Sequence, residues 1–330
     1  MPFLVDSVTA ALSEMEAQVH LVIHPILQVK RDGNGKLTDV AAAHESADSS
    51  GEKAQRAQKT GSAKSGWMRE SVMHVEVSEQ PSERLPEVTA ALERVLRDVR
   101  LAVRDWRQMR DKMAGLVKDL KKAPPPLEKD EIDEGIAFLE WVNDDHFTFL
   151  GYREYSFEGS GKSAVAKVDH DKGLGILSDP DYRVFDGLRN LGTLPPDVRE
   201  FLHQPQLLRI TKANRRSTVH RAVHMDTIAV KMFDDAGNVT GERLFAGLFT
   251  SVAYSRSPRD IPLLRRKVDR VMQRSGFRPD SHDGKALLHI LESYPRDELF
   301  QISEQQLYEI ALGILHLQER QRIALFTRQD

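Results

Sequence analysis

The sequence contains no cysteine in its 330 residues. Disulfide frameworks and thiolate chemistry are therefore excluded. No stretch approaches the ~20 consecutive apolar residues of a transmembrane helix. Asp6 interrupts the N-terminal apolar residues before the core of a signal peptide could form. These absences predict a cytoplasmic protein with no membrane partner.

An excess of charge of either sign is also missing. The chain has 47 Lys and Arg against 50 Asp and Glu, a net charge of -3. This balance argues against a chain that binds nucleic acid over its whole surface, so any basic site must be local. The apolar content of 40% and the charged content of 29% are ordinary for a globular protein long enough for two or three domains.

The known glycine-rich nucleotide motifs are absent. Gly173 and Gly175 lack the third glycine and the strand, turn and helix of a dinucleotide fingerprint. Gly284-Lys285 lacks the upstream glycine and the following Ser or Thr of a phosphate loop. We therefore expect no cofactor in this chain.

Two histidine pairs have the i, i+4 spacing of metal ligands on a helix. They are His20/His24 and His220/His224. Both pairs lie among β-branched residues that favour strands, and four residues of strand span ~13 Å. That separation is too large for two imidazoles to bind one ion, so we expect no metal site.

The strongest helical pattern runs from Leu85 to Leu120, where apolar residues recur alternately three and four positions apart. This spacing forms a heptad seam and predicts partner helices. A single helix of this length would reach ~54 Å. The alternative is a break near Arg104-Asp105 that yields two packed helices, and the pattern leaves both open.

The other apolar patterns predict strands and shorter helices. A polar loop at 40–66, rich in Ala, Ser, Lys, Gly and Glu, is expected to be a flexible insertion. The expected strands are 19–31, 67–77, 146–157, 163–168, two runs joined by a turn at 234–238, and an unpaired run at 322–327. The expected helices are 8–15, 131–143, 261–275, 284–294 and one that a capping box opens at 303–306.

A basic cluster lies in the segment 207–262, which otherwise alternates as a half-buried sheet does. Its residues are Lys212, Arg215, Arg216, Ser217, Thr218, His220 and Arg221. The cluster could bind a carboxylate or phosphate, because Arg presents paired donors to such anions. The alternative, a solvated or interdomain ion-pair face, is the commoner role of such a cluster. Nucleic acid is the weaker alternative, since no aromatic residues are interleaved for base stacking.

A second candidate anion site lies near the N-terminus. Asp6 and Ser7 are expected to cap the helix at 8–15. The free N–H groups of a helix start favour a carboxylate, although the charge of Asp6 opposes a second negative group.

Several stretches resemble the N-terminal region of the large NAD-specific glutamate dehydrogenases of bacteria. The stretches are MPFLVDSV at 1–8, HLVIHP at 20–25, HFTFLGYREY at 146–155, ITKAN at 210–214, STVHR at 217–221, LFTS at 248–251, IPLLRRK at 261–267, GF at 276–277, SHDGKALL at 281–288 and YPRDELF at 294–300. Together they cover nearly the whole chain apart from the polar loop.

The resemblance implies an α+β fold of tandem ACT-like modules (ferredoxin-like βαββαβ) with mainly antiparallel sheets, joined by helical segments. The implied parts are a first module at 1–122 that lacks its first strand, a linker and helix at 123–145, a second module at 146–275, a helical segment at 276–320, and the first strand of a third module at 321–330. We therefore expect a piece of a longer chain.

The resemblance also implies a role. The parent enzyme would oxidise L-glutamate to 2-oxoglutarate and ammonia with NAD, and its catalytic and nucleotide-binding residues would lie downstream, so none is assigned here. The implied role is regulatory and assembly-forming, with a homo-oligomer, the downstream catalytic region and an amino-acid effector as partners. The candidate ligand residues are Asp6, Ser7 and the basic cluster. The alternative is a structural oligomerisation scaffold without a ligand.

Overall fold

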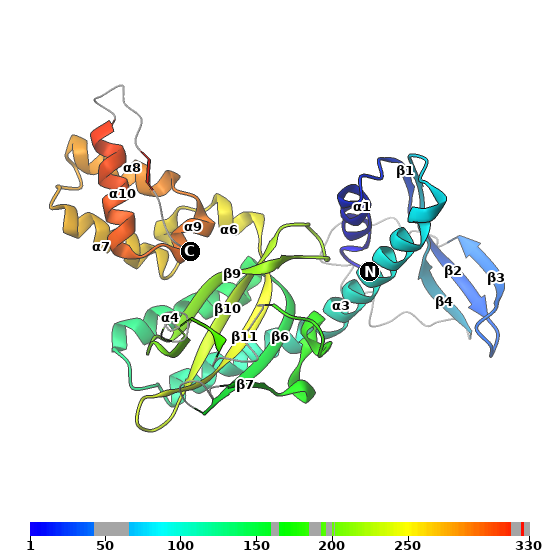
Figure 1. The fold of residues 1–330 in the computed structure, drawn as a ribbon, viewed down its shortest axis with the longest axis horizontal. Coiled ribbons are helices and arrows are strands. Elements are labelled where there is room, and N and C mark those ends of the chain that lie inside the picture. Colours follow the sequence, from blue (N-terminus) through cyan, green and yellow to red (C-terminus); the bar gives the residue numbers. More distant parts are fainter. Residues whose placement is uncertain are drawn as a thin grey trace. The chain divides into compact units, whose positions relative to one another are not determined.

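The computed structural model describes residues 1–42, 66–159, 165–184, 193–195, 200, 202–317 and 325–326. Contacts between Cα atoms divide the chain into two compact units, Met1–Leu96 and Arg97–Asp330. Each unit combines helices with antiparallel sheets (Figure 1), so the predicted α+β class is confirmed. The division falls after Leu96, inside a helix, whereas the sequence suggested a boundary at 122. The boundaries of the ACT-like modules stay predictions.

The N-terminal unit carries two antiparallel sheets. One pairs β1 with β5, and the other has the order β3-β2-β4. The elements are α1 (Leu4–Glu14), β1 (Val19–Ile23), β2 (Ile26–Arg31), β3 (Leu37–Ala42), β4 (Trp67–Ser71), β5 (His74–Val77) and the 3-10 turn η1 (Ser82–Arg84). The predicted loop at 40–66 therefore begins inside β3, and its residues 43–65 lie outside the described part of the chain.

Two strands predicted as continuous are each divided. The run 19–31 breaks between Ile23 and Ile26, and the run 67–77 breaks between Ser71 and His74. Pro25 has no N–H to donate to a ladder, so the chain leaves one sheet there and enters the other. The Pro25 carbonyl instead accepts a hydrogen bond from the Val72 amide at 3.1 Å.

The first helix begins earlier than predicted. Helix α1 starts at Leu4, and Phe3 occupies the N-cap position with a left-handed φ of 63°. Ser7 lies inside the helix, 1% exposed, and donates its hydroxyl to the Phe3 carbonyl. The expectation that Asp6 and Ser7 cap this helix is therefore wrong. Leu4 belongs to the buried face with Val8 and Leu12, and its burial extends the helix by a turn.

The heptad seam forms one continuous helix, α3 (Leu85–Lys122), which excludes the alternative of a break near Arg104. Asp105 is buried at that point, 3% exposed, and its Oδ2 accepts a hydrogen bond from the Gly175 amide at 2.9 Å. Gly175 has a φ of 59°, and a Cβ there would lie 2.1 Å from the Leu150 carbonyl oxygen, so only glycine fits.

The C-terminal unit is built on a sheet with the order β7-β6-β11-β10-β9, and β8 pairs with β6. Its strands are β6 (Phe147–Glu158), β7 (Val165–Val168), β8 (Leu174–Gly175), β9 (Leu208–Arg216), β10 (His224–Phe233) and β11 (Val239–Phe249). The predicted turn at 234–238 joins β10 to β11, and Asp234 accepts hydrogen bonds there from the amides of Ala236 and Asn238. That hairpin prediction is confirmed.

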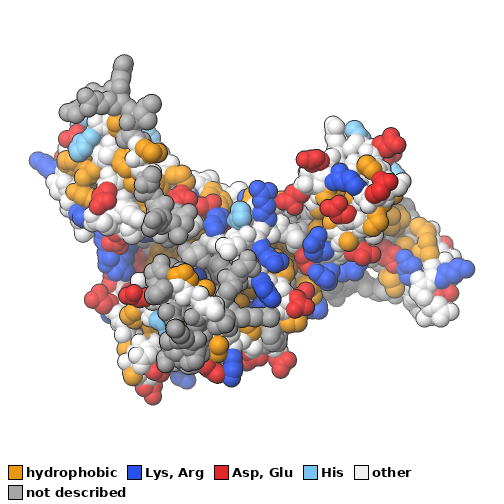
Figure 2. Space-filling view, in the orientation of Figure 1, with side chains coloured by type: hydrophobic (Ala, Val, Ile, Leu, Met, Phe, Trp, Pro, Cys, Tyr) orange, Lys and Arg blue, Asp and Glu red, His pale blue; other side chains and the backbone are white. Residues whose placement is uncertain are grey.

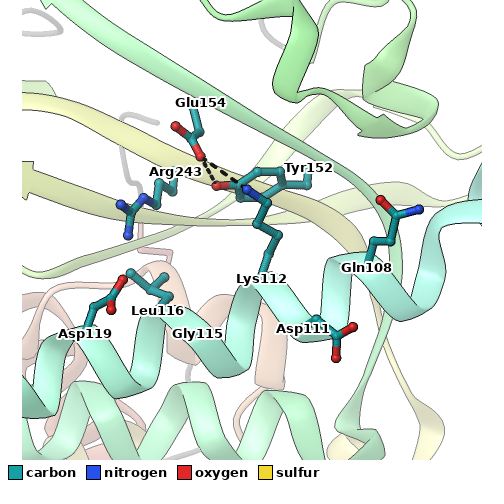
Figure 3. A pocket seen from close by; sticks show the side chains of 9 residues that line it. All are labelled: Gln108, Asp111, Lys112, Gly115, Leu116, Asp119, Tyr152, Glu154 and Arg243. Atoms are coloured by element: carbon teal, nitrogen blue, oxygen red, sulfur yellow. Dashed lines mark hydrogen bonds and ion pairs between the residues drawn. The ribbon is translucent and has the colours of Figure 1, made fainter.

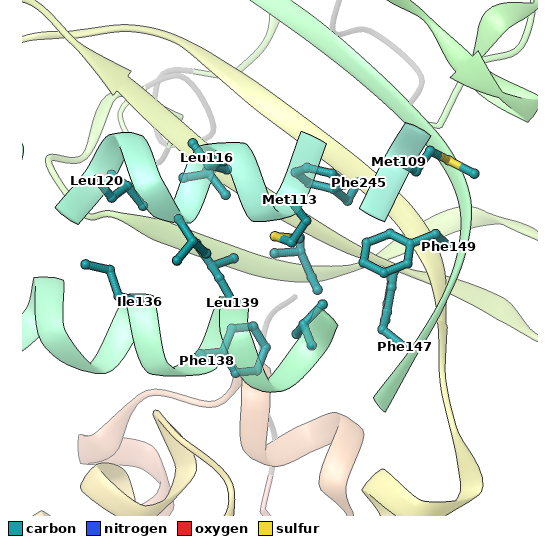
Figure 4. Packing of buried hydrophobic residues seen from close by; sticks show 14 of the residues in the cluster. Met109, Met113, Leu116, Leu120, Ile136, Phe138, Leu139, Phe147, Phe149 and Phe245 are labelled. Atoms are coloured by element: carbon teal, nitrogen blue, oxygen red, sulfur yellow. The ribbon is translucent and has the colours of Figure 1, made fainter. Parts of the chain in front are cut away.

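One face of this sheet packs against the second half of α3 and against α4 (Lys129–Trp141) (Figure 4). The shared core is rich in aromatic and long aliphatic side chains. Its buried members include Met109, Met113, Leu116, Leu120, Ile136, Phe138, Leu139, Phe147, Phe149 and Phe245. The seam therefore packs on a sheet as well as on one helix, whereas its heptad spacing suggested helices alone.

The opposite face of the sheet holds buried charge. Arg209 and Glu242 form an ion pair at 2.7 Å, with side chains 5% and 0% exposed. Arg153, 3% exposed, donates to the carbonyls of Leu177, Asp179 and Tyr182. These bonds hold the segment after β8 against β6.

The chain after β11 folds into a helical bundle with its own core. Helix α6 (Ser251–Ser255) packs Ala253 into the core of the sheet. The helices of the bundle core are α7 (Leu264–Ser275), α8 (His282–Ser293), α9 (Arg296–Gln301) and α10 (Glu304–Leu317). The predicted capping box is confirmed, because Ser303 accepts from the Gln306 amide and the Gln306 side chain accepts from the Ser303 amide. Of the strand predicted at 322–327, only Leu325 and Phe326 are described, and neither is in a strand.

Lys267 links two helices of this bundle. Its Nζ donates to the carbonyls of Leu299 and Ile302, at the end of α9, at 2.6 and 2.7 Å. We expect Lys267→Met to lower the free energy of unfolding by about 1–3 kcal/mol, because both carbonyls lose their donor. Denaturant unfolding measures the change. Lys285→Met, at an exposed lysine on α8, is the control, and equal effects of the two variants would contradict this role.

A buried lysine predicts a pH dependence of stability. Burial, with the nearby charge of Arg209, lowers the pKa of Lys231 to about 8 from 10.5, and its Nζ donates to the carbonyls of Leu202 and Gln204. Between pH 8 and about 10 the unfolded chain then binds more protons than the folded chain, so the free energy of unfolding should rise with pH. Denaturant titrations across that window should show a smaller slope for Lys231→Met. A slope unchanged from the parent chain would show that Lys231 does not titrate there.

Candidate functional site

The basic cluster lies at the end of β9 and in the loop that joins β9 to β10. Lys212, Arg215 and Arg216 belong to the strand, and the other members of the cluster follow in the loop. The Ser217 amide closes this loop by donating to the Val223 carbonyl at 2.8 Å. The structure thus keeps the cluster in one region, whereas Asp6 and Ser7 belong to the other unit.

Most of the cluster's polar groups contact other parts of the chain. Lys212 Nζ lies 2.7 Å from Asp226 and 3.1 Å from Asp297. Thr218 donates to Asp98 at 2.7 Å, and Arg221 donates to the Phe249 carbonyl at 2.7 Å. The Arg215 guanidinium lies 5.8 Å from the centre of the Tyr182 ring. These contacts favour the ion-pair face among the alternatives, while the ligand role of the cluster stays a prediction.

Lys212 is the centre of a network that joins the sheet to the helical bundle. Asp226, 4% exposed, accepts from the Phe249 amide, and Tyr254 donates to Asp297 at 2.7 Å. Burial raises the pKa of the Asp226 carboxyl, although the charge of Lys212 opposes that shift. Burial and the charge of Asp226 raise the pKa of the Tyr254 phenol, so it stays a hydrogen-bond donor near neutral pH.

A second candidate site is a groove of about 380 Å³ between α3 and the sheet (Figure 3), which we call the α3 groove. Its lining residues are Gln108, Asp111, Lys112, Gly115, Leu116, Asp119, Tyr152, Glu154 and Arg243. Those on α3 recur every three or four residues and so share one side of the helix. Tyr152 and Glu154 lie two apart on β6, and Arg243 lies opposite Glu154 on β11.

Glu154, which lines this groove, has three cationic or donor neighbours within 4.0 Å. The Tyr152 hydroxyl donates to it at 2.5 Å, Lys172 Nζ lies 3.3 Å away and Lys112 Nζ lies 4.0 Å away. Burial acts to raise the pKa of Glu154, but the hydrogen bonds from Tyr152 and Lys172 hold it below its ordinary value. Burial and the contact with Glu154 raise the pKa of Tyr152. The groove therefore holds a carboxylate and a neutral phenol near neutral pH.

Comparison with known proteins covers both units. Residues 1–96 match the family model "Glutamate dehydrogenase, ACT1 domain", and residues 261–320 match "Glutamate dehydrogenase, helical motif 1". The whole chain is 40% identical to the NAD-specific glutamate dehydrogenase of Halomonas elongata and 34% identical to that of Pseudomonas aeruginosa. The chain is homologous to the N-terminal region of NAD-specific glutamate dehydrogenases.

The likeness extends to a third glutamate dehydrogenase, that of Mycobacterium tuberculosis, at 25% identity over 99% of the chain. The chain spans 19% of the length of the first two relatives and 18% of the third. The ACT1 match coincides with the N-terminal unit, which also ends at Leu96. The helical motif coincides with the bundle from α7 to α10.

Two absences concern the described residues alone. Within them, no helix is both long and apolar enough to cross a bilayer. The same residues contain no group of three or more His, Cys, Asp or Glu arranged to hold a metal ion.

The sequence did not indicate the α3 groove. The i, i+2 spacing of Tyr152 and Glu154 shows only that they share a strand face. Their proximity to Arg243 follows from the β6–β11 register, and their proximity to Lys112 from the packing of α3 on the sheet. Neither could be read from local spacing.

The contacts of the basic cluster predict unequal effects of its cations on stability. Lys212→Met should lower the free energy of unfolding by about 1–3 kcal/mol, because Asp226 stays buried without its cation. Arg215→Ala with Arg216→Ala should change it by less than about 0.5 kcal/mol, because both side chains are exposed. Denaturant unfolding of the two variants tests this. A larger loss in the double variant would show that the cluster's exposed end stabilises the fold.

Proposed function

We propose that this chain is the regulatory and assembly segment of a cytoplasmic NAD-specific glutamate dehydrogenase. The whole enzyme would convert L-glutamate, NAD and water to 2-oxoglutarate, ammonia and NADH. We assign NAD and the catalytic groups to the downstream region of the same enzyme, which would be the main partner of this segment. The observation that carries the proposal is the ACT1 match over residues 1–96, within a chain similar along its whole length to these enzymes.

The ACT1 match supports a regulatory role because domains of this type pair edge to edge and often bind amino acids at the shared interface. The N-terminal unit has short sheets whose outer strands could pair in this way. The candidate ligand groups named from the sequence are the start of α1, with Asp6 and Ser7, and the basic cluster. Arg215 and Arg216 are exposed and could receive a carboxylate.

Exposed apolar side chains support assembly into a homo-oligomer. Figure 2 shows hydrophobic side chains on the surface of the N-terminal unit. The large ones, between 41% and 53% exposed, are Met1, Leu21, Ile23, Ile26, Leu37, Val40, Met68, Val72 and Leu85. Most lie on β1 to β4. Such concentrations of exposed apolar surface are typical of interaction sites.

A scaffold without a ligand is the second candidate function, and the same exposed apolar strands favour it. The two candidate functions differ in one respect: only the regulatory function requires an amino acid to bind.

Thermal unfolding of this chain with a panel of amino acids, glutamate and aspartate included, tests the regulatory role. A ligand at a hundred times its dissociation constant stabilises the folded state by ~2.7 kcal/mol. For units of this size we expect the midpoint to rise by roughly 5–10 °C with one or two of the amino acids. D-enantiomers at the same concentration are the control for nonspecific effects.

A sedimentation measurement on the same samples separates the two functions. An oligomer that no amino acid stabilises would favour the scaffold. NAD-linked turnover of glutamate by this chain alone would contradict both proposals.

A further inference from the structure

Two hairpin turns of this chain are built alike, 32–36 between β2 and β3 and 234–238 between β10 and β11. In each, the carboxylate of the aspartate at the first position accepts hydrogen bonds from the amides of the third and fifth residues, between 2.8 and 3.0 Å. The aspartate carbonyl accepts from the amide of the fourth residue, a glycine, at 3.0 Å. The two glycines, Gly35 and Gly237, have φ values of 80° and 85°, which favour glycine. Both turns are therefore fixed by their aspartate and their glycine.

The third position differs between the turns and contributes only its backbone amide to these bonds. It is Asn34 in the first turn and Ala236 in the second. Asn34 is exposed, and among the described residues its side-chain amide makes no hydrogen bond. The second turn keeps the same backbone bonds with a methyl group at this position. The fold therefore does not need the Asn34 side chain, which is free to rotate.

The next residue, Gly35, places no bulk beside its peptide nitrogen. It is exposed, and a Cβ built on it would meet no atom within 4 Å. The Arg31 guanidinium donates to the Gly35 carbonyl at 2.8 Å, and its positive charge favours loss of the nearby N–H proton because it stabilises the anion that forms. Two contacts oppose this loss. Gly35 donates its N–H to the Asp32 carbonyl, and Glu70 shares the charge of Arg31.

We propose that Asn34 is a site of spontaneous deamidation. The Gly35 nitrogen, once it has lost its proton to water or hydroxide, attacks Cγ of Asn34 and closes a cyclic imide. The bond from Cγ to the side-chain nitrogen breaks, and that nitrogen takes up a proton and leaves as ammonia. Water then opens one of the two imide carbonyls and yields aspartate or isoaspartate. The reaction needs no oxidant, reductant or enzyme.

The other described asparagines lack this combination of features. Asn238 donates its side-chain amide to Asp234 at 3.0 Å and precedes a β-branched residue. The side-chain oxygen of Asn143 is buried. Asn214 lies inside strand β9. Among these residues only Asn34 combines a free side-chain amide, an exposed turn and a following glycine, so we expect it to react first.

The two products would change the turn in different ways. Aspartate adds a negative charge close to Asp32, whose carboxylate holds the turn. Isoaspartate adds a methylene to the backbone, so the amides of residues 34 and 36 would no longer align with that carboxylate. The turn helps to set the register of the hairpin of β2 and β3 (Figure 1). Because β3 carries the exposed Leu37 and Val40, the modification would alter part of the apolar surface that we propose for assembly.

Incubation of the folded chain at neutral and at alkaline pH, followed by peptide mapping with mass spectrometry, tests the proposal. We expect Asn34 to convert from amide to acid faster than the other described asparagines. The conversion should be faster at alkaline pH, because more of the Gly35 nitrogen is deprotonated. Enzymatic carboxyl methylation measures the isoaspartate fraction.

The same chain unfolded in urea is the reference for the effect of the fold. It should react faster than the folded chain, because the hydrogen bond from Gly35 to Asp32 is then absent. An Asn34 that stays intact in the folded chain, while it reacts in urea, would overturn the proposal.

Two variants use the second turn as an internal control. Asn34→Ala gives the first turn the residue that the second turn already has. It should abolish the modification and leave the midpoint of thermal unfolding unchanged. Ala236→Asn creates an Asn-Gly pair in the second turn and should add a second site of deamidation. Reaction at Asn34 without reaction at position 236 of this variant would overturn the shared turn geometry as the cause.

The consequence for the fold is tested separately. The isoaspartate form, purified after incubation, should unfold at a lower temperature than fresh chain, and incubated Asn34→Ala chain should not. The site itself goes beyond the proposed function and does not require it. Deamidation at Asn34 with unchanged sedimentation would support the site and overturn its effect on assembly, while the proposed regulatory and assembly role would be unaffected.

Discussion

The packing of helix α3 on the sheet of the C-terminal unit is the constraint on which the candidate sites depend. Met109, Met113 and Leu116 are buried against aromatic side chains of β6 and β11. Burial of a large apolar side chain contributes roughly 1.5–3 kcal/mol, so this seam fixes the rotation of the helix about its axis. Once that rotation is fixed, the residues one position before the seam, Gln108, Lys112, Gly115 and Asp119, line the α3 groove at the rim of the sheet. The α3 groove is the part of that rim where a glycine leaves the space open.

The same sheet is buried on both faces, and this explains its unusual content of charge. Arg209, Glu242 and Lys231 would be costly to bury alone, but each has a partner among carboxylates or backbone carbonyls. Arg153 similarly binds three carbonyls of the segment after β8. Carbonyl groups outside helices and strands need hydrogen-bond donors. The buried Lys231 and Arg153 side chains supply such donors and so hold these irregular segments against the sheet.

The basic cluster and the α3 groove show how far side-chain type alone can guide an assignment. The cluster was conspicuous because its cations are close in sequence, yet Lys212 and Arg221 serve contacts within the chain. The groove draws its charges from α3, β6 and β11, so nothing in the local sequence marks it. Clustering in sequence reports local charge density, whereas a site requires groups from different elements that converge in space.

The sequence by itself determined the hairpin at 234–238, the helix from Leu85 and the capping box at 303–306, because each depends on local periodicity or turn chemistry. Its resemblance to glutamate dehydrogenases, rather than any local pattern, implied the α+β class. Only the tertiary structure decided that α3 is unbroken, that the run 19–31 divides at Pro25 and that Arg243 lies opposite Glu154. These features follow from long-range packing and strand register, and residue spacing along the chain carries no direct record of either.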